Sequence, residues 1–139
     1  PEEADPKIME MACNVCAALK NATSYLIYGE MLPTEELPVP GMDIYIQGLD
    51  FGFKRKSITV PSVLSMFWKN PAGKIASALA NVSDETKIVD IPVDSYMKHI
   101  QKVFVEINGY EKRYWRNIVK GKVRLKMPAR SAAVVREES

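Results

Sequence analysis

The strongest constraint on the fold comes from the alternation of basic and apolar residues between positions 122 and 127. The two kinds alternate without interruption, as Lys122, Val123, Arg124, Leu125, Lys126 and Met127. Successive side chains of a β-strand point to opposite faces, so the apolar residues must meet a core while the basic residues meet water or an anion. The segment therefore predicts a half-buried strand of an antiparallel sheet.

Alternating or β-branched residues bounded by turn signals predict further strands. Strands are expected over residues 42–53, 57–60, 87–91, 110–119 and 122–127. Asn108-Gly109 marks a turn, and the last two strands are expected to pair as a hairpin about Lys120-Gly121.

Helical spacing of apolar residues predicts a helix over about residues 6–28, with Asp5 as its N-cap and Gly29 as its stop. Further helices are expected over residues 61–68, over 72–81, and from Asp94 towards 107. The stretch 103–107 of the last helix also favours a strand, so both alternatives stay open there.

These elements predict a single α+β domain in which an antiparallel sheet packs against two to four helices. A chain of 139 residues is long enough to form one domain without a metal or a disulfide. We expect an N-terminal helix in residues 1–30, a proline-rich linker or arm in 31–41, the α+β core in 42–130 and a flexible tail in 131–139.

Charge is sorted along the chain. Residues 1–50 hold nine acids and two bases, whereas residues 102–130 hold nine bases and two acids. Such polarity suits a protein that binds polyanions with one region and copies of itself through both. The whole-chain net charge of +2 conceals this separation.

Seven bases fall within the fifteen residues from 112 to 126, with aromatic residues among them. This mixture favours nucleic-acid backbone or anionic lipid headgroups, although a solvated strand face remains the alternative. The candidate contact residues are Lys112, Arg113, Arg116, Lys120, Lys122, Arg124 and Lys126. On the acidic side, the residues expected to mediate self-association are Glu2, Glu3, Asp5, Glu35 and Glu36.

No catalytic constellation accompanies the charge pattern, so we expect no enzyme activity, no cofactor and no metal. His99 is the one histidine and has no nucleophile signature paired with it. Cys13 and Cys16 are the only cysteines and lack the second ligand pair of a structural zinc site. We expect both to be reduced, buried thiols on one face of the first helix.

Two segments carry a family resemblance. Residues 44–68 combine a strand, a basic turn, a short strand and a small helix that ends in an aromatic residue. Residues 110–117 form a basic-aromatic stretch that continues through Lys120-Gly121 into the alternating strand. Together they cover about a third of the chain and resemble the globular core of rhabdovirus matrix proteins.

The resemblance implies an α+β matrix protein that coats a helical ribonucleoprotein, self-associates and touches the inner face of the viral envelope. It implies a location in the virion and the host cytoplasm, without secretion. The expected partners are other copies of the chain, with the nucleocapsid protein, RNA backbone or an anionic membrane as further possibilities. The chain has no Pro-Pro-x-Tyr motif, so budding through that motif is not expected.

From residues and resemblance together, the sequence predicts a non-enzymatic assembly protein that bridges ribonucleoprotein and membrane. The acidic arm of one copy is expected to dock on the basic face of a neighbour or on the nucleocapsid. The alternative is a small RNA-binding protein that uses the basic C-terminal hairpin.

Overall fold

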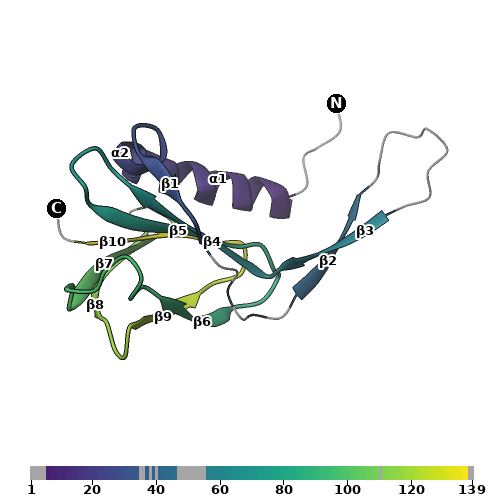
Figure 1. Cartoon of the computed structure of the whole chain (residues 1–139). Coiled ribbons are helices and arrows are strands. Elements are labelled where there is room, and N and C mark those ends of the chain that lie inside the picture. The colour runs from purple at the N-terminus through teal and green to yellow at the C-terminus, as the bar shows by residue number, and fades with distance from the viewer. Residues whose placement is uncertain are drawn as a thin grey trace.

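The computed structural model describes residues 6–34, 37, 39, 41–46, 56–109 and 111–137. It is built from three layers, which are a long helix, a six-stranded antiparallel sheet and a two-stranded sheet below it (Figure 1). The elements are α1 (Pro6–Asn21), α2 (Thr23–Leu26), β1 (Glu30–Leu32), β2 (Gly41–Ile46), β3 (Lys56–Pro61), β4 (Val63–Lys69), β5 (Ile75–Asn81), β6 (Lys87–Pro92), β7 (Lys102–Ile107), β8 (Lys112–Asn117), β9 (Lys122–Met127) and β10 (Ala132–Arg136).

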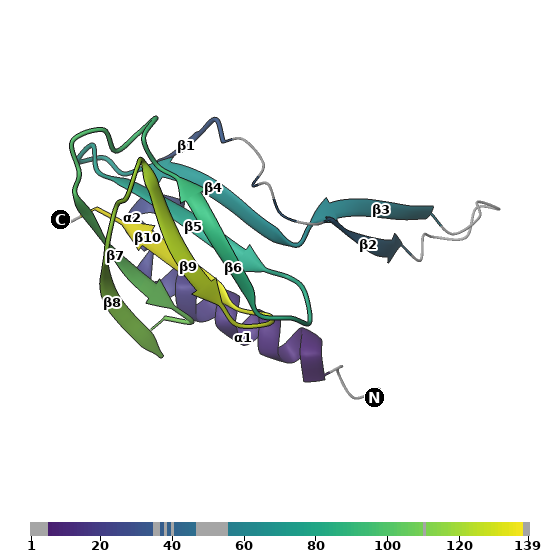
Figure 2. The ribbon, with the colours of Figure 1, turned by 90° about the horizontal axis from the view of Figure 1, so that it is seen from below.

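The large sheet has the strand order β1-β4-β5-β10-β7-β8, and β6 pairs with β9 in the lower layer. A third pair, β2 and β3, projects from the layers as a two-stranded ribbon (Figure 2). No helix within the described residues combines the length and the apolarity needed to cross a bilayer.

The main hydrophobic core lies between the large sheet and the β6–β9 pair. Val105 and Val135 face it from the large sheet, while Val123, Leu125 and Met127 face it from β9. All five are almost completely buried. The half-buried strand expected over residues 122–127 is therefore confirmed, with its apolar side turned inward as the alternation requires.

The opposite face of the large sheet is covered by α1. Ala18 of the helix and the small side chains of Ala76, Ala132 and Val134 form a second buried cluster there. Alanine allows the helix to approach the sheet closely. The helix expected over residues 6–28 is present as α1 followed by the single turn α2.

The expected fold class is wrong, because the structure is mostly antiparallel sheet with one long helix. The segments read as helices over 61–68 and 72–81 are β4 and β5. Val63 and Phe67, four residues apart, lie on one face of β4. A spacing of four fits a strand as well as a helix, because it is a multiple of two and close to one helical turn.

The third expected helix is also a strand. Residues 102–107 form β7, and residues 94–99 before it form turns. The alternative reading of 103–107 as a strand is the one confirmed. Asn108 and Gly109 both have positive φ, of 52° and 72°, and turn β7 into β8, so the expected turn is confirmed.

The expected domain boundaries need two corrections. Residues 132–136 of the supposed tail form β10, which lies between β5 and β7 and is buried on both faces. The supposed linker over 31–41 supplies part of β1, and its Leu37 is buried in the main core. A short apolar run such as the one in residues 132–135 is typical of a central strand that is buried on both faces.

The other expected strands are partly within the described residues. β2, β3 and β6 confirm strands at the start of 42–53, over 57–60 and over 87–91. Residues 47–55, which include the rest of the first strand, lie outside the described residues.

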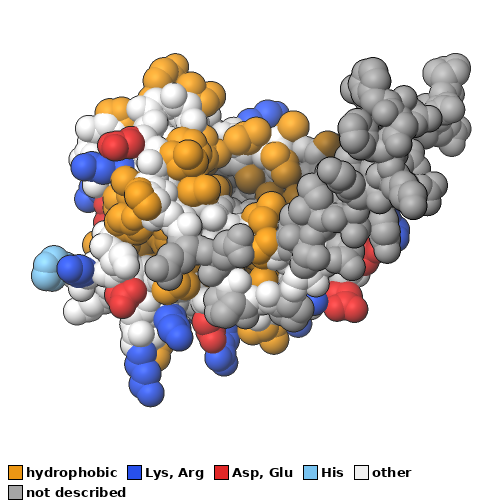
Figure 3. All heavy atoms as spheres, turned by 45° about the vertical axis from the view of Figure 1, so that its right-hand side comes forward, with side chains coloured by type: hydrophobic (Ala, Val, Ile, Leu, Met, Phe, Trp, Pro, Cys, Tyr) orange, Lys and Arg blue, Asp and Glu red, His pale blue; other side chains and the backbone are white. Residues whose placement is uncertain are grey.

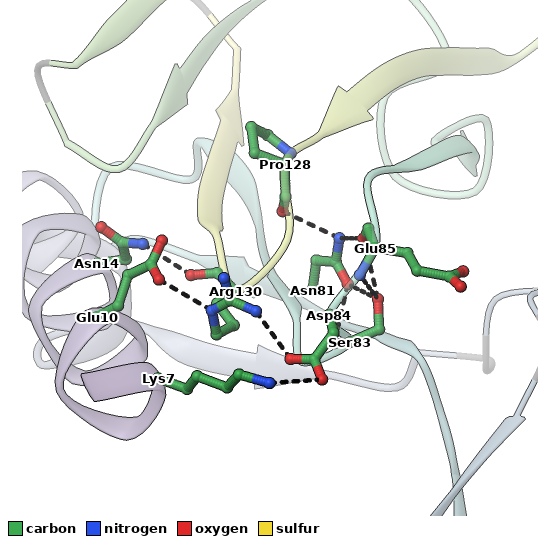
Figure 4. Close-up of polar contacts among 9 residues, drawn as sticks. All are labelled: Lys7, Glu10, Asn14, Asn81, Ser83, Asp84, Glu85, Pro128 and Arg130. Atoms are coloured by element: carbon green, nitrogen blue, oxygen red, sulfur yellow. Dashed lines mark hydrogen bonds and ion pairs between the residues drawn. The ribbon is translucent and has the colours of Figure 1, made fainter. Parts of the chain in front are cut away.

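Arg130 connects α1 to the loops of the sheet through hydrogen bonds (Figure 4). Its guanidinium donates hydrogen bonds to Glu10 on the helix at 2.9 Å and to Asp84 at 2.8 Å. Its carbonyl accepts a hydrogen bond from the Asn14 amide at 2.7 Å. Hydrogen bonds from Lys7 and then from Arg130 hold the pKa of Asp84 below its usual range. The helix is thus held by directional contacts as well as by its alanine face.

Asn81 joins the end of β5 to the segment between β9 and β10 (Figure 4). Its side chain is fully buried, and its amide nitrogen lies within 2.9–3.0 Å of the carbonyls of Glu85, Met127 and Pro128. Its oxygen accepts hydrogen bonds from the backbone and hydroxyl of Ser83. One side chain therefore contacts polar groups of two segments, the turn after β5 and the end of β9 with the residue after it.

Replacing Asn81 with alanine should lower the free energy of unfolding by about 2–3 kcal/mol, because buried carbonyls lose their donor. Thermal and urea unfolding followed by circular dichroism measure the change. Asn117→Ala, at an exposed strand position, is the matched control and should stay within about 0.5 kcal/mol of the parent. Equal stability of both variants would show that the hydrogen bonds of Asn81 do not contribute to the free energy of unfolding.

Candidate anion-binding groove

The turn after β8 carries the chain from the large sheet to the lower one. Ile118 donates a backbone hydrogen bond to Gln101 at 2.8 Å, and Val119 and Lys122 bond to each other at 2.9 and 3.0 Å. Lys120 and Gly121 between them have positive φ, of 52° and 73°. A Cβ on Gly121 would lie 2.9 Å from the Cβ of Asp94, so this position needs glycine.

The expected hairpin between 110–119 and 122–127 is therefore only a tight turn. β8 pairs with β7 and β9 pairs with β6, so the two basic strands belong to different sheets. Their outward sides nevertheless adjoin. The two sheets bring together bases that a simple hairpin would have spread over one surface.

Six of the seven candidate bases line a groove between β8 and β9. The groove consists of two adjoining hollows of about 430 and 320 Å³ that share Arg116 and Arg124. The larger hollow is lined by Asp90, Arg116, Asn117, Val119, Lys120, Lys122 and Arg124. The smaller is lined by Ile88, Lys112, Tyr114, Arg116, Arg124 and Lys126. We call this surface the basic groove.

Basic side chains also project along the lower margin of the space-filling view, where Figure 1 places β6, β9 and the turn after β8 (Figure 3). Residues two apart on one strand lie about 6.6 Å from each other, so Lys122 and Lys126 are separated by about 13 Å. That length exceeds a single phosphate group. The row therefore suits a chain or a surface of anions better than one small ion.

Asp90 is the one acid among the described residues that line the groove. It accepts hydrogen bonds from Arg124 Nε at 2.8 Å and from Arg124 Nη2 at 3.1 Å. The two form a bidentate ion pair between β6 and β9. The hydrogen bond from Arg124 is the main cause that lowers the pKa of Asp90, and the charge of Lys122 adds to it. The pair orients the guanidinium at the centre of the groove.

Arg113 does not belong to the groove, which corrects the expected set. It lies on the other face of β8, where its Nε is 3.2 Å from Glu106 and its guanidinium is 5.2 Å from the centre of the Phe104 ring. Neighbouring residues of a strand point to opposite faces, so Arg113 cannot point the same way as Lys112.

The acidic residues expected to mediate self-association, Glu2, Glu3, Asp5, Glu35 and Glu36, lie outside the described residues, as does Tyr110.

Sequence reasoning missed the part that Asp90 plays in the groove. No signal in the sequence pairs Asp90 with Arg124, because β6 and β9 are separated along the chain by two strands of the other sheet. The alternation of side chains along 87–91, with Val89 and Ile91 apolar, was the one signal that the carboxylate of Asp90 points outward, as the basic side chains do.

The two cysteines and the one histidine all lie at exposed positions. Cys13 and Cys16 are both exposed on α1, so the expectation of buried thiols is wrong. The helix turns a different stripe, with Ala18, towards the sheet. His99 lies on an exposed turn. Within the described ranges, no three His, Cys, Asp or Glu side chains are grouped so as to hold a metal ion.

Comparisons with known proteins do not assign a family. No family model matches the chain, and no curated protein matches it. Solved structures match parts of it at low identity. The GH51 arabinofuranosidase from Xanthomonas axonopodis pv. citri matches at 16% identity and a TM-score of 0.46, over 68% of this chain and 21% of that one.

Two further structures match in a similar way. The GH30 endoxylanase from Clostridium papyrosolvens C71 has 10% identity and a TM-score of 0.45, over 61% of this chain and 23% of that one. The catalytic domain of GH30 xylanase C from Talaromyces cellulolyticus has 16% identity and a TM-score of 0.41, over 61% and 20%. The chain thus spans about a fifth of the length of these proteins. Likeness at this level carries no argument about function.

Removing the guanidinium partner of Asp90 should return the pKa of its carboxyl towards the ordinary value. Arg124→Ala is therefore expected to raise the Asp90 titration midpoint, measured from the carboxyl carbon by NMR. Lys122→Ala is the matched control and should move the midpoint less, because Lys122 acts only through its charge. An unchanged midpoint in Arg124→Ala would contradict the ion pair.

The sign of the stability effect follows from the lowered pKa. The ion pair stabilises the fold above the unfolded pKa of the carboxyl, and this contribution disappears as the pH falls through the folded pKa. Because both groups are exposed, the effect should be small and should weaken with salt.

Proposed function

We propose that the chain is a non-enzymatic binding protein whose basic groove holds the phosphate backbone of RNA. One observation carries the proposal, namely that six basic side chains from two different sheets line one groove with a single carboxylate among them. Like charges repel, so such a gathering is unfavourable unless an anionic partner is present to neutralise it.

An extended polyanion fits the groove better than a compact one. The six basic side chains follow two strands instead of closing round a point. Within the described part of the chain, Arg124 is the one of the six that forms an ion pair with Asp90. Lys and Arg contacts of this kind bind phosphate without reading the base sequence. We therefore expect binding that depends strongly on salt and weakly on sequence.

Binding of a fluorescent 20-nucleotide oligouridylate should weaken steeply with salt. If all six bases neutralise phosphates, the slope of log K against log salt is about −4. The variant Lys122→Glu with Arg124→Glu should lose about tenfold or more in affinity, with a shallower slope. Fluorescence anisotropy at several salt concentrations measures both quantities.

The matched control reverses two exposed lysines outside the groove, Lys20→Glu with Lys98→Glu, and so makes the same change in net charge. It should bind nearly as the parent does. Equal losses of affinity in both double variants would show that RNA binding depends on net charge alone and would refute the role of the basic groove. Binding to phosphatidylserine vesicles without binding to RNA would replace RNA with a membrane surface.

The second candidate function is self-association into an assembly, as the resemblance to matrix proteins implies. An apolar groove of about 540 Å³ runs between α1 and β4, where Leu19 and Leu64 are each 45% exposed. Hydrophobic side chains gather on the side of the molecule from which the ribbon projects (Figure 3). A second copy of the chain is the occupant that this candidate assigns to that surface.

The ribbon supports the same candidate. Its strands β2 and β3 pair with each other and, within the described part of the chain, with no other strand. A two-stranded ribbon is at best marginally stable in water when it stands alone. A neighbouring copy that covered the ribbon would stabilise it.

Self-association through the apolar groove should be lost in Leu64→Lys, because a charge would then have to be buried. Light scattering and native mass spectrometry should show oligomers of the parent at high concentration and monomers of the variant. Ile27→Lys, at another exposed apolar position outside the groove, is the control. A parent that stays monomeric at high concentration and low salt would rule the candidate out.

A further inference from the structure

The face of the large sheet that carries α1 is only partly covered by the helix. The cluster beneath α1 takes its sheet residues from β4, β5 and β10, with Trp68, Ala76, Ala132 and Val134, and none from β7 or β8. Figure 2 shows β8 lying to one side of the helix. Around Trp115, which is 45% exposed, the helix therefore leaves the outer two strands uncovered, on the face opposite to the one that lines the basic groove.

Aromatic and cationic side chains form a layer on this face. Phe104 is the cross-strand partner of Trp115 in β8, and Arg136 is its partner in β10. The Phe104 and Trp115 rings meet edge to face at 5.1 Å between centres. Lys102 Nζ lies 5.0 Å from the Trp115 ring centre, and the Arg136 guanidinium lies 5.1 Å from that of Phe104. The interactions are those expected between cations and π faces.

A buried carboxylate holds this layer in place. The side chain of Glu106 is only 3% exposed and contacts Arg136 at 3.0 Å and Arg113 at 3.2 Å. Both guanidiniums lie against the Phe104 ring, so the carboxylate fixes the support on which the Trp115 ring rests. A fixed support reduces the entropy lost when a ligand stacks on the ring.

Trp115 itself is 45% exposed, although tryptophan is a large apolar residue. Its neighbour in the layer, Phe104, is half-buried. Among the described residues, the cation over the indole comes from Lys102, an exposed and flexible side chain that can move aside and pair with a phosphate. The indole therefore offers a planar, apolar surface within a field of positive charge.

We propose that Trp115 stacks on a nucleobase of single-stranded RNA, whose phosphate chain continues round the edge of β8 into the basic groove. The inference rests on the proposed RNA-binding function and adds the class of nucleic acid. β8 is the edge strand of its sheet, so no neighbouring strand blocks the path between its two faces. Trp115 and Arg116 are adjacent and point to opposite faces, which places base contact and phosphate contact one residue apart.

Single strands are favoured because their bases can leave the stack and lie flat on an aromatic ring. The bases of a duplex are stacked on each other and cannot reach Trp115 while the phosphates occupy the groove. The groove alone would accept the phosphates of either form. Trp115 is thus the residue that would distinguish them.

The test compares a 12-nucleotide oligouridylate with an RNA duplex of the same length. Trp115→Leu should weaken binding of the single strand by about tenfold, the range measured for the loss of one base–aromatic stack, and leave duplex binding unchanged. Trp115→Phe should restore most of the single-strand affinity. Thermal unfolding of each variant verifies that the fold persists.

A second measurement does not depend on altering Trp115. In a Trp68→Phe background Trp115 is the only tryptophan, because the chain has two. Stacking should quench its fluorescence as the oligouridylate is added, and duplex should not. Unchanged emission at saturating single strand, or equal affinities of the parent and Trp115→Leu, would overturn the inference.

These variants also distinguish stacking on Trp115 from RNA binding by the basic groove. If the Lys122→Glu and Arg124→Glu variant loses RNA binding while Trp115→Leu keeps it, the groove stands and the stacking site is refuted. If the parent binds neither form of RNA, the proposed function itself is refuted.

Discussion

Burial of Val123, Leu125 and Met127 against the large sheet is the contact on which the basic groove depends. Each of these side chains is at most 1% exposed, and full burial of an apolar side chain of this size stabilises a fold by about 1.5–3 kcal/mol. Because the side chains of a strand alternate, burying this set forces Lys122 and Lys126 outward. Since β9 then lies beside β8, the bases of both strands share one groove.

The two faces of β8 hold positive charge in different ways. On one face, buried Glu106 pairs with Arg113 and Arg136 and fixes them against an aromatic ring. On the other face, exposed basic side chains line a groove in which Asp90 carries the one carboxylate of the described residues. Water and salt screen the repulsion among exposed bases. The first arrangement supports a rigid surface, and the second leaves cations available to a partner.

The strand β5, expected from the sequence to be a helix, is largely buried on both faces. In β5, Ile75 and Leu79 face the main core while Ala76 faces α1. No polar residue then marks an outward face along most of such a strand, and a spacing of four residues fits either period. β10 was missed for the same reason. β9 was predicted correctly because only one of its faces is buried.

The candidate site was predictable to the extent that it depends on local sequence. The bases of 112–126 could be identified and, in β9, assigned to one face. Long-range pairing decided the rest, since β8 pairs with β7 and β9 with β6. That pairing brought Asp90 to Arg124 and placed Trp115 beside Phe104, whereas the exclusion of Arg113 follows from side-chain alternation along β8.

The sequence by itself determined the side-chain alternation of β9, the turns at Asn108-Gly109 and Lys120-Gly121, and the first helix. All of these depend on backbone preferences and periodicity within a few residues. Only the tertiary structure decided which strands share a sheet and which charges meet. Those contacts join residues far apart in the chain, and they follow from how apolar faces are shared between layers.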